Sequence, residues 1–159
     1  MLIRAIRPDD KQALRDGIKR ASPESAYHRF FQQKLDLSDK ELVYFTEVDF
    51  EHHVALVAII PADRTYVGVG RYVVLKDVPG KIAEVAFAVD DEYRGRGIAT
   101  LLLQHLTEIA RAAGLSEFQA TVLADNQSML DVLSHSELPM LQETVGDLVE
   151  IRLSLTGAR

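Results

Sequence analysis

The sequence predicts an α/β (α+β) fold in which helices cover a mixed sheet, and two features of the chain indicate this. Residues 54 to 89 hold three apolar runs separated by turn residues, which is the pattern of neighbouring antiparallel strands. Helical patterns lie before and after these runs and do not alternate with each of them, so a doubly wound parallel sheet is not expected. We assign residues 1–159 to one domain, because a chain of this length builds one core.

The first third of the chain is predicted to hold one strand and three helices. The strand is Leu2–Ile6, where the residues alternate as a strand requires. Three helix-start signals follow: a proline with acidic neighbours, a serine followed by proline, and a capping box. They predict helices at Lys11–Arg20, from Ser22 onward, and from Ser38 with Leu42, Phe45 and Val48 on one face.

The remainder is predicted to contain the rest of the sheet, a long amphipathic helix and a C-terminal hairpin. Val78-Pro79-Gly80 has the residue order of a type II turn between two of the strands. The expected elements are strands at 54–60, 66–75 and 82–89, a helix at Ile98–Ala113 ending at Gly114, a strand at Phe118–Leu123, a helix capped by Asp125 or Asn126 that reaches Leu133, and a hairpin of Met140–Val145 and Leu148–Leu155.

Composition excludes several classes of site and partner. The chain has no cysteine, which rules out disulfides, thiolate metal sites and a cysteine nucleophile. His28, His105 and His135 lack the spacing of metal ligands, so no metal site is expected. A formal net charge of -6 argues against a nucleic-acid binder. No apolar run reaches the length of a membrane span and no signal peptide is evident, so we expect a cytoplasmic protein without a membrane partner.

The segment Glu84–Ala99 organises the chain, because an apolar strand runs there into a basic, glycine-rich turn that opens a helix. A helix start has unpaired backbone N–H groups and partial positive charge, and glycine lets an anion approach the backbone. Arg94 and Arg96 add full positive charges. Glycines also serve ordinary turns, so the loop alone leaves that alternative open. The loop lacks the Gly-Lys-Ser/Thr ending of the Walker phosphate-binding pattern, which argues against that kind of site. A dinucleotide-binding fold would place such a loop after its first strand, whereas this loop follows three neighbouring strands.

The residues Arg94-Gly95-Arg96-Gly97-Ile98-Ala99 resemble the acyl-CoA signature of the Gcn5-related N-acetyltransferases (GNAT), Gln/Arg-x-x-Gly-x-Gly/Ala. The segment 123–129 is similar to the strand, asparagine turn and helix that follow in that family. The resemblance implies a mostly antiparallel sheet of about six to seven strands flanked by about four helices. The segments 3–10, 22–25, 29–31, 46–49 and 53–57 look like the Pat-type bacterial protein lysine acetyltransferases.

By this resemblance acetyl-CoA is the co-substrate and a protein lysine the acceptor. The diphosphate would bind backbone N–H groups from Arg94 to Thr100, and the pantetheine would pair with the backbone of Phe87 and Val89 as an added strand. The side chains of these two strand residues are expected in the core. The implied cofactor-binding residues are Phe87, Ala88, Val89, Arg94, Gly95, Arg96, Gly97, Ile98, Ala99, Thr100 and Asn126.

Glu84 is the predicted general base, which an amine acceptor needs in order to lose its proton. Strand alternation places Glu84 on one face with Ala86 and Ala88, and we expect a half-buried carboxylate, since burial strengthens it as a base. A solvated or salt-bridged glutamate is the alternative. His52 and His53 are rival bases, although solvated or hydrogen-bonded roles are favoured for both.

Two positions depart from the pattern of the family that the sequence resembles. Leu133 stands where the family often has a tyrosine that protonates the departing thiolate, so water or the thiolate's own basicity must suffice. Glu137 replaces a usual glycine, which puts the local turn in doubt. Asn126 either contacts the cofactor or caps the helix after it.

The residues leave three functions open. The first is an acetyl-CoA-dependent N-acetyltransferase acting on a protein lysine through a ternary complex. The second is a non-catalytic acyl-CoA-sensing module, which the leucine at position 133 motivates. The third keeps the chemistry and changes the acceptor to a small-molecule amine. A homodimer is also left open.

Overall fold

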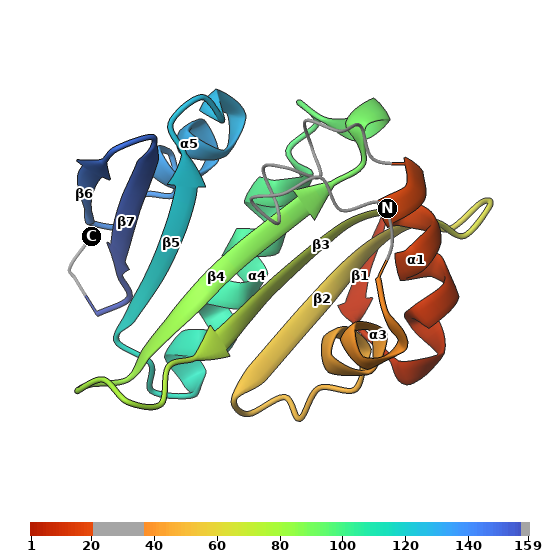
Figure 1. Cartoon of the computed structure of the whole chain (residues 1–159), viewed down its shortest axis with the longest axis horizontal. Coiled ribbons are helices and arrows are strands. Elements are labelled where there is room, and N and C mark those ends of the chain that lie inside the picture. Colours follow the sequence, from red (N-terminus) through yellow and green to blue (C-terminus); the bar gives the residue numbers. More distant parts are fainter. Residues whose placement is uncertain (21–36, 157–159) are drawn as a thin grey trace.

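The computed structural model describes residues 1–20 and 37–156 as one seven-stranded sheet with helices on both faces (Figure 1). The strand order is β1-β2-β3-β4-β5-β7-β6, and only β4 and β5 pair in parallel. The strands are β1 (Leu2–Ala5), β2 (His53–Ile60), β3 (Thr65–Val74), β4 (Ile82–Val89), β5 (Glu117–Leu123), β6 (Met140–Val145) and β7 (Leu148–Ser154). The helices are α1 (Lys11–Arg20), α3 (Asp39–Thr46), α4 (Ile98–Ala112) and α5 (Gln127–Ser134), with 3-10 helices η1 (Pro8–Asp10) and η2 (Asp91–Tyr93).

This architecture confirms the predicted mixed, mostly antiparallel sheet. The predicted strands agree with the observed ones to within one residue at each end, because their apolar patterns match the faces that the sheet buries. The helix expected from Ser22 onward lies outside the described residues. No helix in the described part of the chain is long and apolar enough to cross a membrane.

The predicted helix caps at Ser38 and Gly114 are confirmed, and one predicted helical face is wrong at its end. The Ser38 hydroxyl accepts a hydrogen bond from the backbone N–H of Glu41 at 3.1 Å, and the Glu41 carboxylate accepts one from the N–H of Ser38 at 2.8 Å. Gly114 follows α4 with φ of 84°. Helix α3 stops at Thr46, so Val48 does not continue its apolar face and packs against the sheet instead.

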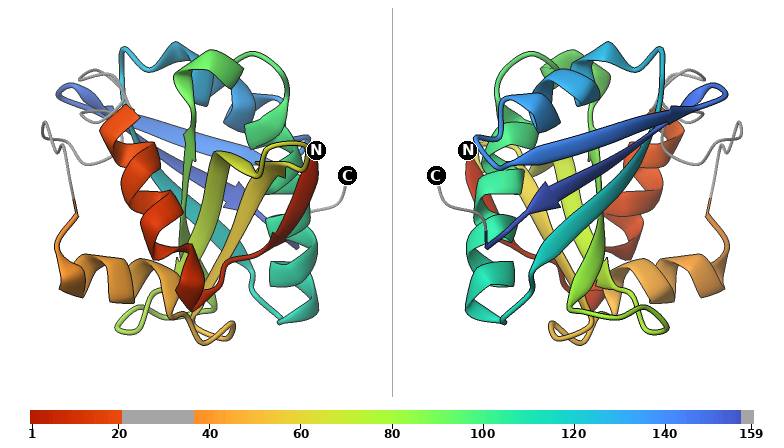
Figure 2. Two further views of the ribbon diagram at one scale, coloured as in Figure 1. Left: turned by 90° about the vertical axis from the view of Figure 1, so that its right-hand side faces the viewer. Right: turned by 90° about the vertical axis from the view of Figure 1, so that its left-hand side faces the viewer.

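Two apolar layers sit on opposite faces of the sheet (Figure 2). Helices α1 and α3 lie on one face, and α4 lies on the other. The larger core joins α4 to the sheet through side chains such as Leu102, Tyr72 and Phe118, which are almost completely buried. On the opposite face a smaller cluster includes Val57 and Val69.

Glycines in β3 allow α4 and its first residue to lie close to the sheet. A Cβ atom added at Gly68 would lie 2.9 Å from Cγ2 of Ile98. One added at Gly70 would lie 2.9 Å from Cδ1 of Phe87 and 3.2 Å from Cβ of Leu102. Larger residues here would overpack the core and push α4 outward. The start of α4 is thereby fixed above β3 and β4.

Asp10 joins β1, the start of α1 and β3 through a buried polar network. Its carboxylate is 2% exposed and accepts two hydrogen bonds of 2.9 Å from the Arg4 guanidinium and one of 2.7 Å from the N–H of Arg7. The Tyr66 hydroxyl also donates to it. Burial by itself would raise the pKa of Asp10, but the hydrogen bonds from Arg4 and Tyr66 outweigh it and hold that pKa below its ordinary value.

The Asp10→Asn substitution is expected to lower the free energy of unfolding by about 3 kcal/mol, because it leaves the largely buried Arg4 guanidinium without its anion. The folded pKa of Asp10 lies below the unfolded pKa, so its stabilisation is complete above the unfolded value, about 3.9, and is lost as pH falls through the folded value. Urea denaturation from about pH 7 to about pH 2 measures both effects. The exposed neighbour Asp9→Asn is the matched control, and equal stability of the two variants would contradict the prediction.

Glu137 shows how the chain keeps a turn without the usual glycine. Its φ is 67°, so the residue adopts the left-handed conformation that glycine favours. The doubt about this turn is resolved, because the turn is retained and the side chain is simply held in a strained backbone conformation.

Glu137→Gly is expected to raise the free energy of unfolding by about 1 kcal/mol, because it relieves this backbone strain. Urea denaturation measures the change. Glu137→Ala removes the side chain and keeps the strain, so it should leave the stability unchanged. An equal gain from both variants would show that the side chain, and not the backbone conformation, is responsible.

Candidate active site

The site is built where β4 and β5 separate. The two strands pair only between Ile82–Glu84 and Glu117–Gln119. Beyond these residues β4 continues to Val89 along β3, in a regular register without a bulge. Its edge toward β5 therefore has no strand partner from Val85 onward within the described residues. An open strand edge of this kind can bind an extended, amide-bearing ligand as an added strand.

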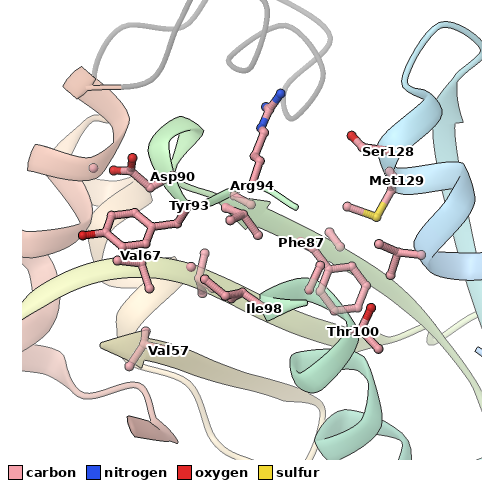
Figure 3. Close-up of a pocket in the computed structure, with 18 of the residues that line it drawn as sticks. Val57, Val67, Phe87, Asp90, Tyr93, Arg94, Ile98, Thr100, Ser128 and Met129 are labelled. Carbon is pink, nitrogen blue, oxygen red and sulfur yellow. The ribbon is translucent and has the colours of Figure 1, made fainter. Parts of the chain in front are cut away.

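A cavity of about 610 Å³ occupies the gap between these strands and extends toward α1. This volume lies in the range of small-molecule sites. Figure 3 shows Asp90 and Tyr93 on one side of the cavity and Ser128 and Met129 of α5 on the other, with Phe87 between them. The lining is mostly apolar, with polar groups concentrated at the loop before α4 and at α5.

The loop before α4 presents backbone donors to this cavity. Gly95 and Gly97 have φ of 77° and 81°, and a Cβ atom added to either would meet nothing within 4 Å. No side chain of the described residues caps α4, and its first helical hydrogen bond runs from the N–H of Leu101 to the carbonyl of Gly97 at 3.0 Å. The N–H groups of residues 98–100 precede that bond. The arrangement suits a phosphate group.

The two arginines of the loop have different positions. Arg94 lines the cavity and extends upward between Tyr93 and Ser128 in Figure 3, and its guanidinium also lies 3.3 Å from the Asp91 carboxylate. The Arg96 guanidinium instead lies over the Tyr93 ring, 5.0 Å from the ring centroid. All the predicted site residues line the cavity except Arg96.

Glu84 borders the cavity, but the expectation that it is half-buried is wrong. Its side chain is exposed, while its neighbours Ala83 and Val85 on the other face of β4 are buried. The alternation is as predicted, with Glu84, Ala86 and Ala88 on one face. Burial fails because Ala86 is small and no described helix covers the face of β4 that carries Glu84 (Figure 1), whereas α4 covers the opposite face.

The histidines that were rival bases lie away from the cavity. His52 is exposed, and its Nδ1 lies 3.2 Å from the Asp49 carboxylate. His53 is buried, and its Nε2 lies 2.9 Å from Nη1 of Arg71. Burial, aided by the Arg71 charge, lowers the pKa of His53 to about 4. Within residues 1–20 and 37–156, no three histidine or acidic side chains gather as metal ligands would.

The segment after β5 contains both the predicted cap and the unusual leucine. The Asn126 side chain accepts a hydrogen bond from the N–H of Met129 at 3.3 Å, which confirms the capping role. Asn126 also lines the cavity, and its contact with a cofactor stays a prediction. Leu133 reaches the cavity from a fully buried position and carries no hydroxyl.

Part of the cavity wall was missed by reasoning from the sequence. Asp10 of η1 and Leu14 and Gly17 of α1 line the cavity together with Tyr66 of β3. No local pattern marks these residues, because they meet only through the fold. From the sequence, Asp10 is typical of a helix start. No sequence pattern indicates that it contacts Tyr66 of β3.

Comparison with known proteins identifies the family. The profile of the acetyltransferase (GNAT) family matches residues 13–135. The chain belongs to this family. An acetyltransferase of Pseudomonas aeruginosa is 30% identical over 134 residues, which cover 83% of this chain and 71% of that protein. Acetyltransferase Pat of Mycolicibacterium smegmatis is 31% identical over 144 residues, which cover 91% of this chain and only 43% of Pat.

Solved structures agree with this GNAT assignment. The crystal structure of the GNAT domain of S. lividans PAT matches with a TM-score of 0.87 and 32% identity, covering 96% of this chain and 89% of that chain. The protein is therefore a GNAT-family acetyltransferase similar to the Pat enzymes, and GNAT acetyltransferases use acetyl-CoA and an acceptor. The resemblance read from the glycine-rich loop is confirmed at the level of the family and of the Pat-type relatives.

The different positions of the two GNAT loop arginines predict different effects on CoA binding. Arg94→Gln is expected to raise the dissociation constant for CoA about tenfold, because Arg94 lines the cavity and the charge-assisted contact to phosphate predicted for it would be lost. Arg96→Gln is expected to change it much less, since this guanidinium lies over Tyr93 and does not line the cavity. Isothermal titration calorimetry gives both constants, and equal losses in the two variants would contradict the assignment.

Proposed function

We propose that this protein is an acetyl-CoA-dependent N-acetyltransferase that acetylates a primary amine, a protein lysine, directly in a ternary complex with Glu84 as general base. The observation that carries the proposal is that Glu84 and the loop before α4 border the same cavity at two ends of one strand. A single continuous segment can thus hold the donor and present the base. The similarity to Pat enzymes supports the lysine acceptor.

The donor would lie along the open edge of β4. Phe87, Ala88 and Val89 supply backbone groups for the pantetheine, and the loop and first turn of α4 supply N–H donors for the diphosphate. The burial of Phe87 supports a role for its backbone alone, because the side chain is held in the core. Acetyl-CoA supplies the acyl group, and the chain orients it.

Proton removal is the task assigned to Glu84. A lysine ammonium has an ordinary pKa of about 10.4, so it must lose a proton before its nitrogen can attack the thioester carbon. The exposed Glu84 can take that proton directly or through one water molecule and return it to solvent. The N–C bond forms as the C–S bond breaks, and the thiolate leaves with the electron pair. The attacking nitrogen loses its second proton to solvent by the same route through Glu84, which leaves the neutral amide.

The departing thiolate needs little help from the protein. A thiol has an ordinary pKa of about 8.5, so its thiolate is a stable leaving group near neutral pH. Leu133 offers no proton from the position that a tyrosine often occupies in the GNAT pattern. We therefore assign to water the protonation that converts the departing thiolate into the thiol of CoA.

A non-catalytic acyl-CoA sensor is the second candidate, and the buried Leu133 is the observation that favours it. An acetyltransferase for a small-molecule amine is a variant of the first. Calorimetry with CoA and mass spectrometry of a cell extract incubated with acetyl-CoA separate these functions. A sensor binds CoA without turnover, and a protein acetyltransferase leaves acetylated lysines. The cytoplasmic location and a homodimer stay predictions.

Glu84→Gln is expected to lower kcat for acetyl transfer to a lysine peptide by about 100-fold or more, because a general base contributes that much. Release of the CoA thiol measures the rate, and calorimetry should show unchanged affinity for CoA. Glu108→Gln, an exposed glutamate on α4, is the matched control and should keep full activity. Full activity in the Glu84 variant would refute the base assignment.

A further inference from the structure

Within residues 1–20 and 37–156, no helix covers the sheet face next to Glu84, and this face continues across three further strands. In the paired register Glu84 stands beside Gln119 of β5, Gln119 beside Arg152 of β7, and Arg152 beside Leu141 of β6. Figure 1 shows β5, β7 and β6 with no described helix in front of them, whereas α1 and α3 cover the β1 to β3 side. We call this surface the open face, defined by Gln119, Leu141, Glu143, Val145, Glu150 and Arg152.

The open face combines exposed apolar side chains with excess negative charge. Leu141 is 68% exposed and Val145 is 50% exposed, and both lie on the edge strand β6. Glu143 and Glu150 stand directly opposite each other in the β6–β7 ladder. Like charges at such positions destabilise a sheet, and no ion pair relieves them within the described residues. A cationic partner would relieve this repulsion.

The positive charge on the open face is already neutralised. The Arg152 guanidinium donates to both oxygens of the Glu117 carboxylate at 2.9 and 3.0 Å. Glu84, Glu143 and Glu150 therefore determine the field that an approaching molecule meets. A second copy of the chain would present the same acidic surface and a net charge of -6, so charge complementarity favours a basic partner over self-association.

We infer that the open face docks the acceptor protein through a basic segment that carries Lys or Arg on one side of the acetylated lysine. This inference rests on the proposed function and adds a sequence preference to it. Strand spacing places Glu150 about 12 Å and Glu143 about 16 Å from Glu84. An extended peptide spans those distances in about four or five residues. The preferred basic residues thus lie about four or five positions from the acceptor lysine.

Two fluorescent peptides test this preference by anisotropy in the presence of CoA. Each has one central lysine, and one peptide carries arginines four and five residues away where the other carries glutamines. The arginine peptide is expected to bind the wild-type chain about tenfold more tightly, because two exposed ion pairs form. Glu143→Gln/Glu150→Gln should abolish this difference and leave the glutamine peptide unaffected. Glu51→Gln/Glu108→Gln, two exposed glutamates outside the open face, is the matched control.

A cross-linking measurement locates the bound peptide independently. The chain has no cysteine, so Leu141→Cys introduces a single thiol that can carry a photo-crosslinker. The arginine peptide should be captured from position 141 and not from Gln104→Cys on α4. Equal capture from both positions, or a preference for arginine that survives in the Glu143/Glu150 variant, would overturn the inference.

The same peptides separate failure of the docking surface from failure of the proposed function. If wild type acetylates both peptides with equal kcat/KM and binds them equally, the open face is not the docking surface and the function stands. If the arginine peptide binds at the open face and no acetyl transfer occurs, the docking surface stands and the proposed function fails.

Discussion

The brief parallel pairing of β4 with β5 is the constraint on which the site depends. β4 is bound to β3 along residues 83–89, and β5 is bound to β7 along its whole length. The two strands touch only at Ile82–Glu84 and Glu117–Gln119. Each strand is paired along its other edge, so the gap opens where the β1–β4 part of the sheet and the β5–β7 part diverge. The opening is therefore a property of the whole sheet, and it leaves a strand edge ready for an extended ligand.

The packing of α4 sets the loop at the end of this opening. Gly68 and Gly70 of β3 remove the side chains that would hold α4 off the sheet, and Ile98 and Leu102 fill the space. The first turn of α4 thus begins where β4 ends. The close packing of α4 and the positive φ of the two glycines direct the backbone donors of the loop toward the cavity, and no side chain of the described residues caps the helix start.

Two carboxylates on the cavity wall show how environment assigns different roles. Asp10 is buried, receives the Arg4 guanidinium and the Tyr66 hydroxyl, and holds β1, α1 and β3 together. Glu84 is exposed on the face of β4 that no described helix covers, and it is accessible to a substrate. The hydrogen bonds of Asp10 give its carboxylate a structural role, whereas the carboxylate oxygens of Glu84 are available for proton transfer.

Sequence alone determined the order of strands and helices, the capping box at Ser38, the glycine-rich loop and the family that it resembles, because each depends on residues close together in the chain. Only the tertiary structure decided that Glu84 is exposed, that Arg96 lies over Tyr93 while Arg94 lines the cavity, and that Asp10 forms part of the wall. These features arise from contacts between distant segments and from what covers each face of the sheet. Local periodicity carries no information about either.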